Sequence, residues 1–314
     1  MIHKRKKVTI IGSGFVGSSC ATWILARDLA DVVLIDVNEG LAKGRALDLF
    51  SASPATNSNV TLTGGSDYSL AEDSDIAVIT AGLARKPGMS RSDLLLKNSE
   101  IMKNICQSLK TACPQAVFII VSNPLDAMVS LAHQILSVPG ERILGMAGVL
   151  DTARFKAFVA EKLNCSVRDI SALVLGGHGD SMVPLTRYAT VGGVPLSVLM
   201  NEPDQKKLIE RTKKGGGEIV SLLKTGSAHY APAVGVVEMI ESILKDQKRI
   251  LPCSALLQGE YGEQGVFVGV PCQLGGKGLE KVVEIPLNAE EQNLFKSSAQ
   301  AVKALLKEMK ELLK

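Results

Sequence analysis

Short apolar runs alternate with longer amphipathic stretches through the first half of the chain. Strands are predicted at the short runs, which are rich in Val and Ile, over residues 8–11, 32–36, 59–63, 76–80, 117–121 and 143–144. Helices are predicted between them, over residues 15–29, 41–50, 94–111 and 124–136. The runs DIAVITAG and AVFIIVSNP are apolar throughout, which is typical of parallel strands that helices cover on both faces. This alternation predicts a doubly wound parallel α/β sheet.

The pattern changes near residues 145–148. Beyond them, strands of a mixed or antiparallel sheet are predicted over residues 171–175, 192–199, 266–271 and 282–286, and helices over residues 152–163, 203–225 and 231–244. The chain ends in an amphipathic helix that begins with a capping-box pattern, Asn288 followed three residues later by Glu291. We therefore expect two domains, residues 1–147 and an α+β domain over residues 148–314.

Composition and charge narrow the functional class. A chain of 314 residues with 46% hydrophobic side chains has room for two domains with large cores. The net charge of +3 without a basic face does not predict nucleic-acid binding. No apolar run reaches the roughly 20 residues that span a bilayer, and no secretory cleavage site follows the basic N-terminus, so we expect a cytoplasmic protein. The six cysteines are scattered without a CxxC motif, so no metal site is expected.

The strongest single motif is the run GSGFVG, which follows the first predicted strand directly and opens the first predicted helix. Its glycines permit a tight turn, the close approach of a diphosphate and close packing of the helix on the strand. The helix N-terminus then offers free N–H groups to the phosphates. The motif predicts that a dinucleotide contacts Gly12, Ser13, Gly14, Phe15, Val16 and Gly17.

The second predicted strand ends in Asp36. A carboxylate at that point accepts hydrogen bonds from the ribose hydroxyls of adenosine and repels a 2′-phosphate, so the sequence favours NAD over NADP as the cofactor. Residues 1–147 are therefore predicted to form a Rossmann domain that binds NAD.

Polar side chains follow the carboxyl ends of several predicted strands, where α/β sheets bind their ligands. An irregular loop with two arginines follows residues 76–80, an asparagine follows residues 117–121, and a histidine follows residues 171–175. A carboxylate and a guanidinium three residues apart share one face of the helix near residue 152. The candidates are Arg85, Arg91, Asn123, Asp151, Arg154 and His178.

These residue types suit the oxidation of an alcohol that carries a carboxylate. Hydride transfer to a nicotinamide requires an acceptor for the hydroxyl proton, and a histidine suits that task near neutral pH. A buried carboxylate would orient the histidine and stabilise its imidazolium form. One arginine would bind the carboxylate in a bidentate manner, and a second would polarise the carbonyl in the reverse reaction.

The motifs GSGFVG, ARKPGMSR, VSNP, LDTARF and GGHGDSMVPL resemble those of the lactate/malate dehydrogenase family, in the same order and over nearly the whole chain. They are most similar to the bacterial, lactate-dehydrogenase-like malate branch. The resemblance implies that His178 donates and accepts the proton and that Asp151 orients it. It implies that Arg154 binds the substrate carboxylate, Arg91 polarises the carbonyl, and Asn123 bonds the substrate. It also implies cofactor contacts at Asn98, Val121, Ser122 and Asn123.

Arg85 indicates the substrate. At the matching position, family members that act on lactate typically carry Gln, and those that act on malate carry Arg. The resemblance therefore implies a dicarboxylate, malate or oxaloacetate, because a neutral substrate tail would leave a buried charge uncompensated. Gly177 and Met89 also match the malate pattern.

Other functions stay open at this point. An L-lactate dehydrogenase or another 2-hydroxy acid dehydrogenase is the alternative within the class. NAD-dependent glycosidases share the architecture but require a metal, and a third alternative is a scaffold without catalysis. The family is oligomeric, so we expect a homotetramer, with a homodimer as the alternative and Trp23 as a packing or subunit-contact residue. His229 is interpreted as a packing residue at the pocket wall or an interface.

Overall fold

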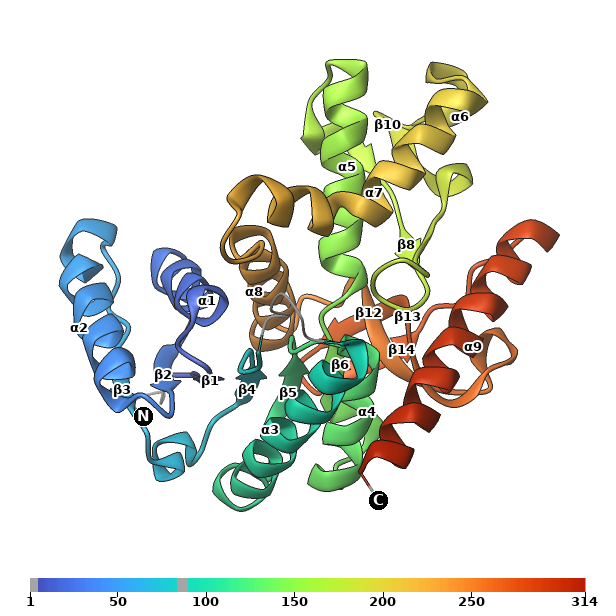
Figure 1. Ribbon diagram of the computed structural model, residues 1–314. Helices are drawn as coiled ribbons and strands as arrows, with labels where there is room; N and C mark the ends of the chain where they lie inside the picture. Colours follow the sequence, from blue (N-terminus) through green and yellow to red (C-terminus); the bar gives the residue numbers. More distant parts are fainter. Residues whose placement is uncertain (1–4, 84–89, 314) are drawn as a thin grey trace.

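The computed structural model describes residues 5–83 and 90–313, and within these residues nine strands form one sheet (Figure 1). Six strands run parallel: β1 (Lys7–Ile11), β2 (Asp31–Ile35), β3 (Leu62–Gly65), β4 (Ile76–Ile79), β5 (Val117–Ile120) and β6 (Ile143–Gly145). Three antiparallel strands continue beyond β6: β12 (Arg249–Gln258), β13 (Gln264–Gly275) and β14 (Gly278–Val282). The order is β14-β13-β12-β6-β5-β4-β1-β2-β3, which confirms the predicted fold class and places both kinds of strand in one sheet.

Helices cover both faces of this sheet (Figure 1). One face carries α1 (Phe15–Ala26), α2 (Glu39–Thr56) and α8 (Tyr230–Leu244). The other carries α3 (Arg91–Ala112) and α4 (Leu125–Leu136), and α9 (Ala289–Leu312) packs against both of these helices while also contributing to the first core. Successive side chains of a strand point to opposite faces, so Ile10 packs on the first helix layer and Ile11 on the second. This burial on both faces explains the uninterrupted apolar runs in the sequence.

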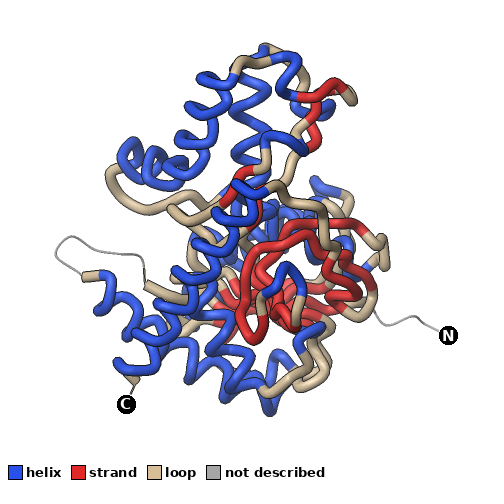
Figure 2. The backbone as a smooth tube through the Cα atoms, turned by 90° about the vertical axis from the view of Figure 1, so that its right-hand side faces the viewer, coloured by secondary structure: helices blue, strands red, loops and turns tan. Residues whose placement is uncertain are grey.

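A smaller layer stands above the sheet, around α5 (Gly148–Leu163) and α7 (Glu202–Leu223) (Figures 1 and 2). It includes α6 (Leu196–Leu199) and the short strands β7 (Ile170–Ser171), β8 (Val174–Leu175), β9 (Val183–Pro184), β10 (Thr190–Val191) and β11 (Val194–Pro195). Phe155, Val159 and Leu196 lie at the centre of its separate core. Five single-turn helices complete the fold: Tyr68–Ala71, Gly140–Arg142, Val167–Asp169, Thr186–Tyr188 and Glu260–Gly262.

Three sequence predictions in the second half are wrong in detail, and one strand was missed. The missed strand is the ten-residue β12; it contains Pro252, a residue that is rare in central strands, and Pro252 faces Pro271 of β13. The strand predicted over residues 192–199 is limited to Val194–Pro195, after which the chain turns into α6. The strand predicted over residues 282–286 ends at its first residue, Val282. Residues 171–175 contain parts of β7 and β8, which belong to different sheets.

The C-terminal helix begins as predicted. Asn288 Oδ1 accepts a hydrogen bond from Glu291 N at 2.9 Å, and Glu291 Oε2 accepts one from Asn288 N at 2.8 Å. This reciprocal capping box fixes the start of α9, which packs against α3 and α4 at the base of the molecule.

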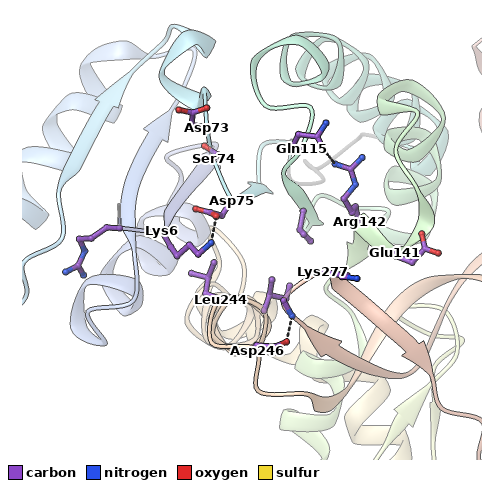
Figure 3. Close-up of a pocket in the computed structure, with 14 residues that line it drawn as sticks. Lys6, Asp73, Ser74, Asp75, Gln115, Glu141, Arg142, Leu244, Asp246 and Lys277 are labelled. Atoms are coloured by element: carbon purple, nitrogen blue, oxygen red, sulfur yellow. Dashed lines mark hydrogen bonds and ion pairs between the residues drawn. The ribbon is translucent and has the colours of Figure 1, made fainter. Parts of the chain in front are cut away.

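A hollow of about 820 Å³ lies at the amino ends of the parallel strands (Figure 3). Its charged side chains largely satisfy one another: Lys6 Nζ lies 2.8 Å from Asp75 Oδ1, and Arg142 Nη1 donates to Gln115 Oε1 at 3.2 Å. Sheets of this type bind ligands at the carboxyl ends of their strands. The hollow in Figure 3 is therefore on the wrong edge of the sheet to be the candidate site.

Candidate active site

The glycine-rich turn connects β1 to α1. Gly12 has φ +100°, a conformation that favours glycine, and a Cβ on Gly17 would lie 1.9 Å from Gly12 O. A Cβ on Gly14 would have nothing within 4 Å, so the backbone is open to a ligand at that residue. Gly14 is the N-cap of α1, so the N–H groups of Phe15 and Val16 are among those that a helix leaves without an internal partner.

Asp36 lies beside this turn, at the end of β2. Its Oδ2 accepts a hydrogen bond from Ser13 N at 2.7 Å, and its Oδ1 accepts one from Asn38 N at 2.9 Å. A cavity of about 550 Å³ opens here between the carboxyl ends of β1 and β4, where the strand order reverses. Its lining includes Gly12, Gly14, Asp36, Tyr68, Ala81 and Ile101. An apolar cavity with a carboxylate and a glycine turn at its edge suits a nucleoside diphosphate.

The ends of β4 and β5 are fastened to each other by buried polar side chains. Ser122 Oγ donates to Ala81 O at 2.5 Å, close to Val121. Asn98 on α3 is 2% exposed; its Nδ2 donates to Asn123 O at 2.7 Å and its Oδ1 accepts from Leu83 N at 2.8 Å. The amide of Asn98 is thus bonded to backbone groups of both loops, and it supports the turn in which the exposed Asn123 stands.

His178 and Asp151 form the centre of the site. His178 Nδ1 lies 2.9 Å from Asp151 Oδ2, and the Asp151 side chain is only 2% exposed. Asp151 is held by the first turn of α5, and His178 follows β8 after two glycines. Burial alone lowers the pKa of His178, but the carboxylates of Asp151 and Asp126 outweigh it, so the pKa is raised above the usual value for histidine. The His178 imidazole is therefore protonated more readily than an ordinary histidine side chain.

Arg154 stands one turn further along α5 and has one donor without a partner among the described residues. Its Nη1 lies 3.4 Å from Asp151 Oδ1, and its Nε is buried without a hydrogen-bond partner among the described residues. Burial lowers the pKa of Arg154, although Asp151 opposes that change. Gly215 and Gly216 of α7 make room for this side chain: a Cβ on Gly215 would lie 3.3 Å from Arg154 Cδ. A buried guanidinium with a free donor is suited to bind an anion.

The two loop arginines are placed differently. Arg91 is the first residue of α3; its side chain is 83% exposed and lies 3.7 Å from Asp180, two residues after His178. It does not contact His178 in this structure, and an exposed ion pair of this kind contributes only about 0–1 kcal/mol. Arg85 and Met89 lie outside the described residues.

Asp126 on α4 is a residue that the sequence analysis missed. It is 4% exposed, and its Oδ2 accepts a hydrogen bond from the backbone N–H of His178 at 2.9 Å. Its Oδ1 accepts a hydrogen bond from Ser254 Oγ of β12 at 2.8 Å. Burial raises the pKa of Asp126 despite these two bonds. Asp126 thus joins three segments behind the imidazole. The signal in the sequence was a single acidic residue in the largely apolar run LDAMVSLA.

The structure therefore brings together two groups of predicted residues. His178, Asp151 and Arg154, the predicted proton carrier and anion site, lie together, and Asp36 lies beside the glycine turn as the predicted nucleotide site requires. His229 packs its ring against Phe15 at 5.2 Å and Tyr230 at 4.0 Å. Within residues 5–83 and 90–313, no cluster of three potential metal ligands occurs. None of the helices in the same ranges is long and apolar enough to cross a membrane.

Comparisons with known proteins cover the whole chain. A family model of the lactate/malate dehydrogenase NAD-binding domain matches residues 6–145, and one of the lactate/malate dehydrogenase α/β C-terminal domain matches residues 148–313. A malate dehydrogenase of Geotalea uraniireducens is 52% identical, over 98% of this chain and 99% of that protein.

Solved structures agree with the sequence comparisons. Malate dehydrogenase from Salinibacter ruber has a TM-score of 0.94 and 46% identity, over 98% of both chains. Lactate dehydrogenase from Cryptosporidium parvum, solved with lactic acid and nicotinamide adenine dinucleotide, has a TM-score of 0.95 and 39% identity, over 99% of both chains.

The charges that surround His178 lead to a prediction about its titration. Asp151 and Asp126 raise its pKa, whereas burial and Arg154 lower it. We expect Asp151→Asn to move the titration of His178 to lower pH, and Asp126→Asn to do so by less, because only Asp151 contacts the ring. The measurement is NMR titration of the His178 imidazole in the wild type and both variants. Since the raised pKa belongs to the folded state, protonated His178 stabilises the fold below the ordinary histidine pKa. That contribution is lost as the pH rises through the raised value. An unchanged midpoint in Asp151→Asn would contradict the electrostatic interpretation.

Proposed function

The chain belongs to the lactate/malate dehydrogenase family, and we propose that it acts as an NAD-dependent malate dehydrogenase that converts (S)-malate and NAD reversibly into oxaloacetate and NADH. The observation that carries the proposal is the His178–Asp151 pair beside the unsatisfied guanidinium of Arg154. A proton carrier next to an anion site is what a 2-hydroxy acid requires at its reacting carbon.

Each residue of this group has a proposed task. Arg154 binds the carboxylate beside the hydroxyl group, which places the hydroxyl near His178. His178 then accepts the hydroxyl proton at Nε2, because Nδ1 is engaged by Asp151, and the buried carboxylate stabilises the imidazolium. When bound, the nicotinamide ring of NAD takes up the hydride. In the reverse direction His178 returns the proton, and Arg91 polarises the carbonyl once it turns inward from Asp180.

The cofactor is proposed to lie across the carboxyl ends of β1, β4 and β5. The cavity beside Asp36 suits adenosine, and the free N–H groups at the start of α1 suit the diphosphate. Val121, Ser122 and Asn123 directly follow β5, and they would contact the cofactor near its nicotinamide end. We accordingly propose residues 1–147 as the NAD-binding domain and residues 148–314 as the substrate-binding domain.

The substrate is proposed to be a dicarboxylate because the chain supplies two arginines for two carboxylates. Arg154 takes the carboxylate next to the reacting carbon, and Arg85 takes the distal one. Support comes from the sequence at residue 85 and from relatives named malate dehydrogenase. A methyl group in place of the distal carboxylate would leave the Arg85 charge without a partner in a closed site.

We also propose that the chain works in the cytoplasm as a homotetramer, with a homodimer as the alternative. Large apolar side chains are exposed on two neighbouring helices of the sheet and on one helix of the upper layer: Trp23 on α1, Leu47 and Phe50 on α2, and Leu222 and Leu223 on α7. An exposed apolar surface of this kind is typical of a subunit interface. All six cysteines are free thiols, which suits a reducing compartment.

The activity is tested by NADH oxidation on addition of oxaloacetate, with pyruvate as the comparison substrate. We expect His178→Asn to lower the turnover with oxaloacetate by at least about 10²-fold, as loss of a general acid does, and to leave NADH binding nearly unchanged. Equal activity of wild type and His178→Asn would mean that another residue carries the proton. Faster turnover of pyruvate than oxaloacetate by the wild type would favour the lactate alternative.

Cofactor choice is tested at Asp36. The carboxylate is fixed by Ser13 N and Asn38 N, so it repels a 2′-phosphate at a defined place. We expect a clear preference of the wild type for NADH over NADPH in kcat/KM, and a smaller preference in Asp36→Ser. Equal use of the two cofactors by the wild type would show that Asp36 does not discriminate between NADH and NADPH.

Substrate choice is tested by comparing Arg85→Gln with Arg154→Gln. Losing a charge-assisted pair in a closed site costs on the order of 2–5 kcal/mol, or roughly 30- to 5,000-fold in kcat/KM. In Arg85→Gln, kcat/KM should fall by about that factor for oxaloacetate only, because pyruvate has no distal carboxylate. In Arg154→Gln, kcat/KM should fall for both substrates. If Arg85→Gln lowers kcat/KM equally for the two substrates, Arg85 does not bind the distal carboxylate and only shapes the site.

A further inference from the structure

Arg45 of α2 reaches across to the glycine-rich turn that begins α1. Its Nη1 donates to Gly14 O at 2.6 Å and to Ser18 Oγ at 2.7 Å, and it also contacts Ser13 O. The guanidinium carbon stands 5.6 Å from the centre of the Phe15 ring. One side chain from 31 positions away in the sequence therefore binds the backbone of the turn at two successive residues.

The contacts of Arg45 fix the direction of the turn's N–H groups. In a trans peptide the carbonyl of one residue and the N–H of the next point in opposite directions. Holding the oxygens of Ser13 and Gly14 therefore turns the N–H groups of Gly14 and Phe15 to the other side. Ser13 is also held through its own N–H by Asp36 Oδ2 at 2.7 Å, so this residue is fixed at both ends.

The charge of Arg45 is the second observation. Within the described residues, no carboxylate forms an ion pair with it, and its Nε and Nη2 make no hydrogen bond to the protein. A cation at the start of a helix is unfavourable, because the helix dipole already makes that end positive. The neighbouring Lys43 on the same helix is, by contrast, paired with Glu39 at 2.7 Å. An anion bound at the start of α1 would compensate both the dipole and Arg45.

We infer that Arg45 is a positioning residue for the diphosphate of the dinucleotide: it holds the Ser13 and Gly14 carbonyls so that the N–H groups face the ligand, and it adds a positive charge behind them. The inference rests on the proposed function in taking a dinucleotide as the ligand. If Arg45 only stabilised the fold of the turn, its loss would weaken the binding of every ligand of the cavity equally. If Arg45 positions the diphosphate, its loss weakens only the binding of ligands that carry phosphate.

The test uses the full-length protein and three variants: Arg45→Gln, Arg45→Lys, and Lys43→Gln as a control for loss of one charge on the same helix. Dissociation constants are measured for NADH by fluorescence, and for ADP and adenosine by competition, at several salt concentrations. We expect Arg45→Gln to raise the dissociation constants of NADH and ADP by about tenfold and to leave the dissociation constant of adenosine unchanged. The salt dependence of NADH binding should be weaker in this variant than in the wild type, because salt screens the lost charge. Arg45→Lys should recover part of the affinity, and Lys43→Gln should match the wild type.

Kinetics give an independent readout. Because the contacts of Arg45 are with the glycine-rich turn, Arg45→Gln should raise the KM for NADH and leave kcat nearly unchanged at saturating cofactor. Equal NADH affinity in wild type and Arg45→Gln would overturn the inference. So would a loss of adenosine affinity equal to the loss of NADH affinity, because it would indicate that Arg45 supports the whole cavity. If the wild type failed to bind NADH at all, both the inference and the proposed cofactor would fall. The first two outcomes leave the proposed function intact.

Discussion

The site depends on holding several ionisable side chains in a space nearly closed to water. Asp151 is almost fully buried, and it contacts both the His178 ring and the Arg154 guanidinium. Taking such groups out of water is unfavourable unless each finds a partner of opposite charge or a hydrogen bond. The Asp151 carboxylate is the shared partner of both cationic side chains, and Arg154 Nε has no hydrogen-bond partner among the described residues. This unpartnered donor is the reason that we propose an anion site here.

The antiparallel strands beyond β6 give this cluster a rigid support. Ser254 of β12 donates to Asp126, whose second oxygen receives the N–H of His178. Gly269 of β13 exchanges two backbone hydrogen bonds with Gly176, and a Cβ on Gly269 would lie 2.5 Å from Gly176 O. The segment that carries the imidazole is thus attached to the same sheet that carries the glycine-rich turn. One continuous sheet therefore determines how far the proton carrier stands from the nucleotide site.

Features that depend on local sequence were predictable. The glycine turn, the residue at the end of β2 and the capping box of α9 each follow from residue types at fixed short spacings, and the structure places them accordingly. Features that depend on tertiary contact were not. The strand β12 was missed. It contains Pro252, and the sequence does not show that the opposite residue in β13 is also a proline. Asp126 and Arg45 acquire their contacts from segments 52 and 31 residues away, at distances that periodicity does not encode.

The glycines at 215–217 have a consequence for the motion of α7. Glycine within a helix is less favourable than alanine by about 1 kcal/mol per residue, and three in succession weaken the middle of an otherwise long helix. A Cβ on Gly215 would be tight, at 3.3 Å from Arg154 Cδ and 3.6 Å from Phe158 Cε2, whereas a Cβ on Gly217 would meet nothing within 4 Å. Local opening of the helix is consequently easiest directly above the buried guanidinium. The amide hydrogens of this turn would therefore exchange with solvent sooner than those on either side, so the weakest part of α7 lies beside the only arginine that α5 buries.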